Sequence, residues 1–569
     1  MQIRYEVNIN IYSKIPENTI VYWLSQNKIK NFGIPISNVL DCKTGLICGN
    51  NEKYIRQWFE VNYKSIGFQC ESLKNTAGDK WFPYNHGGEK TKWYGGHNEI
   101  VYLNNGASAM QKEKNAMFRN SDFYFREGIT WNRVGSGIKF AARKACTGFV
   151  FDDVSPSGFC SAQKYYYLLA FLNTVVFNDY LRLFCTALKV EVGQIGKVPY
   201  KYDSLQDDVV KPISEENVAL SKKDWDSFET SWDFTEHPLV RLSKDLWDAT
   251  AVGASMHYYY GGNPEVGSPL ELCYMLWQGE CNERFKQLKA NEEELNRIFI
   301  DIYGLQDELT PEVEDKDVTV RKADLSRDIK SLISYAVGCM FGRYSLDVDG
   351  IAYAGGDWDE SKYSTFIPDV DNCIPITDEE YFEDDIVGLF CAWLKKVYGE
   401  DTLEENLDFI AKALGNKGAT SREVIRNYFL NDFIKDHIKT YQKRPIYWLF
   451  DSGKQNGFKA LCYMHRWNAD TTGNMRVEYL HRMQRVYEKE IIRMQEIIDN
   501  SRDNKEISNA TKRKEKLQKQ IKETKDYDAK VAHLALSRID IDLDDGVKVN
   551  YEKVQTASDG KKMQILAKI

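Results

Sequence analysis

The stretch KWFPYNHGGEKTKWYGG at residues 80–96, with RNSDFYFREGITWNRVGSG at residues 119–137, mixes aromatic, basic and glycine residues more densely than any other part of the chain. Glycines allow tight turns and a close approach of the backbone to a ligand. Rings, cations and polar side chains together suit a nucleic-acid surface. The same residues also fit a β-rich domain with aromatic cross-strand pairs and glycine turns, and composition alone favours this second interpretation.

Length and composition indicate a multidomain globular protein. The chain has 569 residues, with 43% hydrophobic and 28% charged residues, which is too long for one core and typical of soluble domains. It has no apolar run of 18 residues, and its N-terminus, MQIRYEVNIN, lacks the apolar core of a signal peptide. We therefore expect no membrane partner and a cytoplasmic location. The 12 cysteines include no CxxC pair, which predicts reduced thiols.

Charge is distributed unevenly along the chain. Residues 1–205 carry 25 Lys and Arg against 17 Asp and Glu, whereas residues 206–449 carry 26 against 48. A positive first third followed by an acidic middle indicates that one part alone meets a polyanion.

The periodicity of apolar residues predicts an α+β multidomain fold. We expect a mixed α/β domain at residues 1–205, an acidic helical domain at residues 206–442 and a C-terminal domain at residues 443–569. The C-terminal part should be mainly α-helical. It should contain a long helical hairpin at residues 473–535, because apolar residues follow a heptad pattern until the DNSRDN break. Val477, Ile491 and Ile498 fall at a positions of this pattern, and Leu480, Tyr487 and Met494 at d positions.

Shorter elements are predicted along the chain. In the first domain, we expect a short helix capped near Asn18 or Thr19, a helical segment at 164–184 packed under a sheet, and an extended segment at 190–200. Further on, we expect a buried helix at 331–346, a strand and glycine turn in RPIYWLFDSGKQNGF, and a β element in VKVNYEKV near the C-terminus.

The motifs of an adenine methyltransferase are missing from this sequence. Such an enzyme needs a glycine loop after a strand to hold AdoMet, and an (N/D/S)PP(Y/F/W) loop for the flipped adenine. The chain contains no Pro-Pro dipeptide and no FxGxG between a strand and a helix. It also lacks a P-loop and an HExxH zinc motif. We therefore assign no catalytic residue and no metal ligand to this chain.

A nuclease-like spacing offers one alternative. Asp349, Glu360 and Lys362 could hold Mg²⁺ and position a water molecule. Because this spacing is common by chance, a solvated acidic loop explains it better. His86, in the glycine turn, could touch DNA but is more simply a turn residue, and His465 fits a core position.

Several longer segments carry a resemblance to a known family. The sequence resembles the C-terminal half of the phage growth limitation X (PglX) proteins, adenine-specific DNA methyltransferases of the BREX phage-defence system. The segments that carry the resemblance span nearly the whole chain in the family order. They include TGLICGNNEKYIRQWFEV (44–61), KWFPYNHGGEKTKWYGG (80–96), NSDFYFREGITWNRVGSG (120–137), ELNRIFIDIYGL (294–305), ISYAVGCMFGRYSLD (333–347) and KRPIYWLFDSGKQNGF (443–458).

The resemblance implies that residues 1–205 are a DNA target recognition domain and that a methyltransferase half lies upstream in the family. This chain would then bind no cofactor, S-adenosylmethionine belonging to the complete enzyme. Its partners would be double-stranded DNA, the methyltransferase half or subunit, and other phage-defence components. The alternatives are a recognition-only subunit or remnant, the Mg-dependent nuclease, and a scaffold that uses the hairpin as a protein-binding arm. Our candidate DNA contacts are Thr44, Asn50, Arg56, Lys90, Lys92, Arg126, Thr130, Arg133, Ser136 and Arg143.

Overall fold

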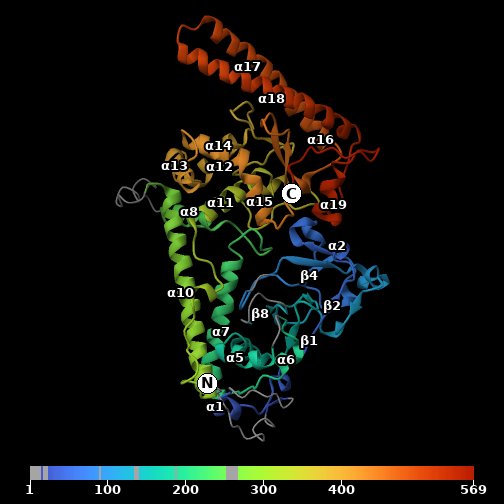
Figure 1. Ribbon diagram of the computed structural model, residues 1–569, viewed down its shortest axis with the longest axis vertical. Coiled ribbons are helices and arrows are strands. Elements are labelled where there is room, and N and C mark those ends of the chain that lie inside the picture. Colours follow the sequence, from blue (N-terminus) through green and yellow to red (C-terminus); the bar gives the residue numbers. More distant parts are fainter. Residues whose placement is uncertain (1–14, 17–23, 89–90, 134–139, 186–188, 251–266) are drawn as a thin grey trace, which may run out of the picture. The chain divides into compact units, whose positions relative to one another are not determined.

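A computed structural model describes residues 15–16, 24–88, 91–133, 140–185, 189–250 and 267–569 (Figure 1). The chain divides into two compact units. Unit 1 comprises residues 1–58, 65–226 and 279–322, and unit 2 comprises residues 59–64, 227–278 and 323–569. The three domain ranges drawn from the sequence stay a prediction. The helix predicted near Asn18 and Thr19 lies outside the described residues.

Unit 1 contains two four-stranded sheets. The first is antiparallel, in the order β1 (Asp41–Lys43), β10 (Ser157–Phe159), β7 (Gly128–Trp131) and β8 (Ala142–Ala145). The second has the order β3 (Ile55–Gln57), β5 (Glu99–Tyr102), β4 (Trp81–Asn85) and β9 (Val150–Phe151), with β4 and β9 parallel. A short pair, β2 (Leu46–Ile47) and β6 (Met117–Phe118), completes the β structure. Both parts of the aromatic–basic stretch therefore supply strands.

Helices cover the first sheet and close the core of unit 1. The segment predicted as helical at 164–184 forms two helices, α4 (Tyr165–Leu172) and α5 (Val175–Phe184), because Thr174 leaves the helical conformation and caps α5 with its side chain. Seven of the eight α4 residues are buried, and α4 contacts β8, which confirms that the segment packs on a sheet. The shorter α-helices are α1 (Gln26–Lys30), α2 (Asn51–Tyr54) and α3 (Asn104–Ala107), and the longer ones are α7 (Ser204–Trp225) and α10 (Pro269–Tyr303), of which residues 279–303 belong to unit 1.

Unit 2 is mainly helical around a small sheet. The strands have the order β11 (Ile374–Pro375), β13 (Lys459–Tyr463) and β12 (Tyr447–Asp451), and β12 and β13 form the predicted hairpin around a glycine turn. The predicted buried helix is α11 (Leu325–Met340), most of whose residues are buried. The other helices are α8 (Pro238–Thr250), α12 (Ile386–Tyr398), α13 (Leu403–Ala413), α14 (Ser421–Asn431), α15 (Phe433–Thr440) and α16 (Thr471–Asn474).

The predicted helical hairpin of unit 2 is confirmed. Helices α17 (His481–Asn500) and α18 (Asn504–Leu536) pack against each other along their length and extend away from α12–α14 (Figure 1). The d positions Leu480, Tyr487 and Met494 are buried, as predicted, but the a position Val477 is 51% exposed. A π-helical turn at Met475–Leu480 explains this difference, because its wider winding shifts Val477 out of the seam.

Two segments predicted as extended are helical. Residues 192–196 form α6 (Val192–Gly196), which begins with a capping box between Glu191 and Gln194. The VKVNYEKV segment lies in α19 (Gly546–Lys553), where Val547, Asn550 and Tyr551 are buried. Their spacing of three and four residues is helical. The alternating valines of VKV predict a strand, but this pattern is too short to decide between a strand and a helix.

Candidate nucleic-acid interface

The aromatic rings of the stretch form core rather than a stacking surface. Eight of them are at most 7% exposed, and only Phe123 of the nine is partly accessible. This outcome favours the interpretation of the stretch as a β-rich domain with packed aromatic pairs. Base stacking on these rings would require them to leave the core. The eight buried rings are Trp81, Phe82, Tyr84, Trp93, Tyr94, Tyr124, Phe125 and Trp131.

A buried arginine joins the two parts of the stretch. Arg143, on β8, is 1% exposed. Its guanidinium donates to Asn132 Oδ1 at 3.1 Å and to the carbonyl of Gly87 at 3.2 Å. Burial lowers the pKa of Arg143 to about 10, but the group still carries its charge at neutral pH. A Cβ on Gly96 would lie 3.4 Å from Arg143 Nε, so a glycine leaves room for the guanidinium.

The turn after β4 is held from several sides. The Gly87 N–H donates to Ser155 Oγ at 2.6 Å, and the Asn132 amide donates to the carbonyl of Gly88 at 2.8 Å. Gly87 and Gly88 have φ values of 67° and 100°, a region that favours glycine. The turn is therefore fixed by β7, β8 and the loop after β9. It leads directly into residues 89–90, and β7 leads into residues 134–139, both outside the described residues.

His86 sits beside this turn between two carboxylates. Its Nδ1 lies 2.7 Å from Glu99 Oε2, and its Nε2 lies 3.5 Å from Asp152 Oδ2. Its ring stacks on Tyr84 at 5.4 Å. Burial alone would lower the pKa of His86, but the hydrogen bond to Glu99 and the charge of Asp152 outweigh it and raise the pKa. Burial raises the pKa of Asp152 to about 7, against the opposing effect of His86.

Several predicted DNA contacts are engaged within unit 1. Lys92 Nζ lies 2.6 Å from Glu292 Oε2. Arg133 pairs with Asp153 at 2.5 Å and with Glu191 at 2.6 Å. A contact between either side chain and a phosphate would have to replace these carboxylates.

Two other predicted contacts are not at the surface. Thr130, on β7, is fully buried and donates to the carbonyl of Pro156 at 3.0 Å. Arg143 is buried in the network above. Both residues position the surrounding loops in this conformation. Lys90 and Ser136 lie outside the described residues.

The remaining predicted contacts lie on other elements. Arg126 is exposed and lies over the ring of Phe123 at 5.2 Å. Asn50 is exposed and caps α2. Arg56, on β3, donates to the carbonyl of Glu52 at 2.6 Å, and the carbonyl of Thr44 accepts from Asn120. The structure therefore brings Arg133 and Arg143 together around Asn132 and the Gly87 turn. That these ten residues contact DNA stays a prediction.

Sequence reasoning missed the polar residues that organise this place. Asn132, Asp152 and Ser155 hold the turn. Asn85, on β4, is 1% exposed, and neither atom of its amide has a hydrogen-bond partner among the described residues. These side chains come from separate strands and loops, so spacing along the sequence carries no signal for them. Asn85 and His86 do stand beside the glycine pair in NHGG, and this pattern could have drawn attention to the turn.

The nuclease alternative finds no support in side-chain geometry. Lys362 donates to the carbonyl of Ala352 at 2.7 Å. Across the described ranges of the chain, no group of three or more His, Cys, Asp or Glu side chains is arranged to hold a metal ion.

Among the helices of the described ranges, none has both the length and the apolar composition of a membrane span.

Two relatives match the chain over nearly all of its length. It is 42% identical over 566 residues to the adenine-specific methyltransferase PglX of Lacticaseibacillus casei (strain Zhang), a match that covers 97% of this chain and 45% of that protein. Over these residues the chain is similar to PglX. It is also 34% identical over 577 residues to the adenine-specific methyltransferase BrxX of Escherichia coli O9:H4 (strain HS), covering 96% of this chain and 45% of that protein. It thus spans a little under half the length of either relative. No family model matches.

Proposed function

We propose that this chain is the DNA-recognition and C-terminal part of an AdoMet-dependent adenine-N6 DNA methyltransferase of a BREX phage-defence system. The observation that carries the proposal is the match of nearly the whole chain to two adenine-specific methyltransferases. The excess of 25 Lys and Arg over 17 Asp and Glu in residues 1–205 supports DNA as the partner of that region.

The proposed division of labour follows from the motifs. Methyltransferase relatives imply AdoMet use by the complete enzyme. This chain has no FxGxG between a strand and a helix and no Pro-Pro dipeptide, so we assign it neither the AdoMet site nor the adenine pocket. We therefore derive no chemical step here and assign this chain to binding and orienting DNA.

The network around Arg143 gives recognition a physical basis. Loops read bases reliably only when a rigid scaffold positions them. The Gly87 turn is fixed to β7 and β8 by Arg143 and Asn132. We propose that this scaffold positions the surface of residues 1–205 that contacts the duplex, with cations such as Arg126 contacting phosphates and polar side chains contacting base edges.

Methyl transfer tests the assignment. Tritium transfer from labelled AdoMet to duplex DNA should be absent with the purified chain alone. It should appear when the N-terminal half of the Lacticaseibacillus casei relative is added. Transfer by the chain alone would overturn the proposal. If the added half binds the chain but no methyl group is transferred, the recognition-only subunit or remnant becomes the better description.

Binding of DNA by this chain is tested separately. Fluorescence anisotropy with a labelled duplex should show an affinity that falls steeply with salt, because phosphate contacts release counterions. An affinity without salt dependence would favour the scaffold alternative.

A further inference from the structure

A large open pocket lies in unit 2, and none of its lining residues is among the predicted DNA contacts. Its volume is about 810 Å³, within the range of small-molecule and side-chain binding sites. The loop after α11 forms most of the lining, and Arg466 and Asn468 after β13, with Asn474 of α16, form the rest. The lining residues that carry the argument are Trp358, Glu360, Val370, Asp371, Asp369 and Arg466.

Aromatic side chains build one wall of this pocket. Trp358 stacks on Tyr363 at 5.0 Å and meets Tyr353 edge-on at 5.0 Å. The Arg466 guanidinium lies 4.6 Å from the Trp358 ring centre. This contact shows that the wall already accommodates one planar cation, as aromatic faces do.

Arg466 belongs to the frame of the pocket rather than to its free surface. Its guanidinium donates to the carbonyls of Asp369 and Val370, each at 2.8 Å. These bonds fix the loop that carries the pocket's carboxylates, and they leave the Arg466 charge directed toward backbone oxygen.

The carboxylates of the pocket have few hydrogen-bond donors and cations around them. Asp369 and Asp371 share one backbone donor, the N–H of Cys373, at 3.1 Å each. The Tyr479 hydroxyl lies 2.9 Å from Asp371 and 2.6 Å from Asp384, although one hydroxyl proton serves one acceptor at a time. The Glu360 side chain is exposed and makes no hydrogen bond or ion pair within the described part of the chain. Three carboxylates thus face one arginine.

The surroundings select an organic cation over the other ligands. Residues 343–385 carry 13 Asp and Glu against 2 Lys and Arg, which repels phosphate and nucleic acid. No metal-holding group of side chains occurs among the described residues. An inorganic ion would also leave most of the 810 Å³ unfilled. A guanidinium or ammonium on an apolar stem fits the carboxylates by its charge and the apolar part of the lining by its stem.

The rim of the pocket identifies the source of that cation. Ile367 and Val370 line the pocket and are 64% and 88% exposed. Apolar residues that flank the cation in a peptide could cover these two side chains. We propose that this pocket binds an arginine or lysine side chain of a partner protein, presented in a segment whose flanking apolar residues cover Ile367 and Val370. This inference does not depend on the proposed role in DNA recognition.

The experiment uses the full chain and two capped tripeptides. N-acetyl-Leu-Arg-Leu-amide carries the cation, and the citrulline analogue has nearly the same shape without the charge. Saturation-transfer NMR and calorimetry at low ionic strength should show binding of the arginine peptide and at least about tenfold weaker binding of the citrulline peptide. The double variant Glu360→Gln with Asp371→Asn should lose about tenfold in affinity.

Controls separate this site from general acidity. Asp357→Asn, an exposed carboxylate of the same loop outside the pocket lining, should bind the peptide as the unmodified chain does. Val370→Ser should weaken the tripeptide but not N-acetyl-arginine amide. Equal binding of the arginine and citrulline peptides, or unchanged binding by the double variant, would overturn the proposal. If spermidine displaces the peptide at a concentration tenfold below that of the peptide, the cation would come from a free polyamine rather than from a partner protein.

A proton signature gives an independent readout. Burial and the charge of Asp371 raise the pKa of Asp369 to about 7, opposed by the Cys373 N–H and by Arg466. A cation in the pocket favours the ionised carboxyl, so binding near pH 7 should release protons. The binding enthalpy should then vary with the ionisation enthalpy of the buffer, and the citrulline peptide should show no such variation.

Discussion

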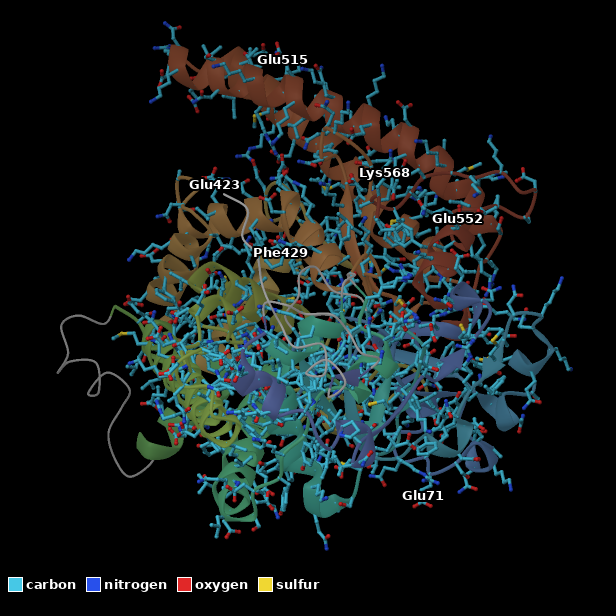
Figure 2. The ribbon with its side chains drawn as sticks, turned by 60° about the horizontal axis from the view of Figure 1, so that its bottom comes forward. Glu71, Glu423, Phe429, Glu515, Glu552 and Lys568 are labelled. Carbon is cyan, nitrogen blue, oxygen red and sulfur yellow. The ribbon has the colours of Figure 1, made fainter. Side chains whose placement is uncertain are left out.

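The cations of the aromatic–basic stretch and those of the helical hairpin differ in how many of them are paired within the fold. In the stretch, Lys92 and Arg133 pair with carboxylates of unit 1, and just after it Arg143 donates to Asn132 Oδ1 and to the carbonyl of Gly87. On the hairpin, side chains cover both helices (Figure 2, where Glu515 marks α18), and many cations are exposed. Nine of them form no ion pair within the described part of the chain: Arg482, Arg485, Lys489, Arg502, Lys505, Lys512, Lys519, Lys522 and Lys530.

This difference teaches that the density of cations in a sequence does not measure the charge available to a partner. Cations next to buried strands are used by the fold, since a charge near the core needs an oxygen partner. Many cations on the two-helix arm stay in water, although Arg513 and Lys516 pair with Asp378 and Lys525 pairs with Glu488. Substitutions should therefore affect stability in the stretch and leave it nearly unchanged on the hairpin surface.

The largest effect is expected at the seam of the hairpin. Leu480 is fully buried, and Leu480→Asp places an unpaired carboxylate there. We expect a loss of roughly 4 kcal/mol in the stability of unit 2, measured by thermal unfolding and helicity in circular dichroism. Val477→Asp, three residues earlier but 51% exposed, should change stability by less than about 0.5 kcal/mol. Unchanged melting and helicity for Leu480→Asp would refute the buried seam.

The next largest effect is expected at Arg143. Arg143→Met keeps the length of the side chain but leaves Asn132 Oδ1 and the Gly87 carbonyl without this donor. We expect a loss of roughly 2–3 kcal/mol, seen in denaturant unfolding of the full chain. Arg126→Met, at an exposed site, is the matched control and should unfold as the unmodified chain does. Equal stability of the two variants would mean that Arg143 does not support the turn.

The sequence predicted the parts of this structure that depend on periodicity. The packed helices at 164–184, the buried helix α11 and the hairpin α17–α18 follow from apolar spacing. The candidate site could not be predicted equally well. Whether Arg143 or Arg126 reaches the surface depends on which oxygens the fold brings near them, and Asn132, Gly87 and Ser155 meet only in the folded chain. Likewise, the pairing of Lys92 with Glu292 joins residues 200 positions apart.

A smaller effect, on DNA affinity alone, is expected at Arg126. Reversing the charge of Lys92 or Arg133 would break ion pairs inside unit 1. A loss of DNA affinity could then not be separated from a loss of stability. Arg126 is exposed, so Arg126→Glu should leave unfolding unchanged. If Arg126 contacts a phosphate, the change should weaken binding to all duplex sequences by about tenfold and lower the salt slope by about one. Unaltered affinity and slope in fluorescence anisotropy would remove Arg126 from the interface.

The smallest effect is expected in the pH dependence of unit 1. A carboxyl whose folded pKa is raised costs stability as it ionises, so Asp152, shifted from 3.8 to about 7, lowers stability as pH rises through that range. His86, whose pKa is also raised, stabilises below about pH 6.5 and loses this contribution as pH rises through its folded pKa. Both contributions therefore lower the stability of unit 1 as pH rises. The attraction between ionised Asp152 and charged His86 offsets part of the burial cost, so we expect a net change of about 1 kcal/mol.

Asp152→Asn isolates this contribution, because the amide oxygen can still accept from the Ser155 N–H. Calorimetry of the full chain at pH 5 and pH 8 should show a smaller fall in melting temperature for Asp152→Asn than for the unmodified chain. Buried carboxyls of unit 2, such as Asp369 with its raised pKa, contribute equally to both proteins and cancel in the comparison. Asp41→Asn, at an exposed carboxylate of unit 1, should keep the original pH dependence. An identical fall in all three proteins would show that the His86–Asp152 pair is not titrating in the folded state.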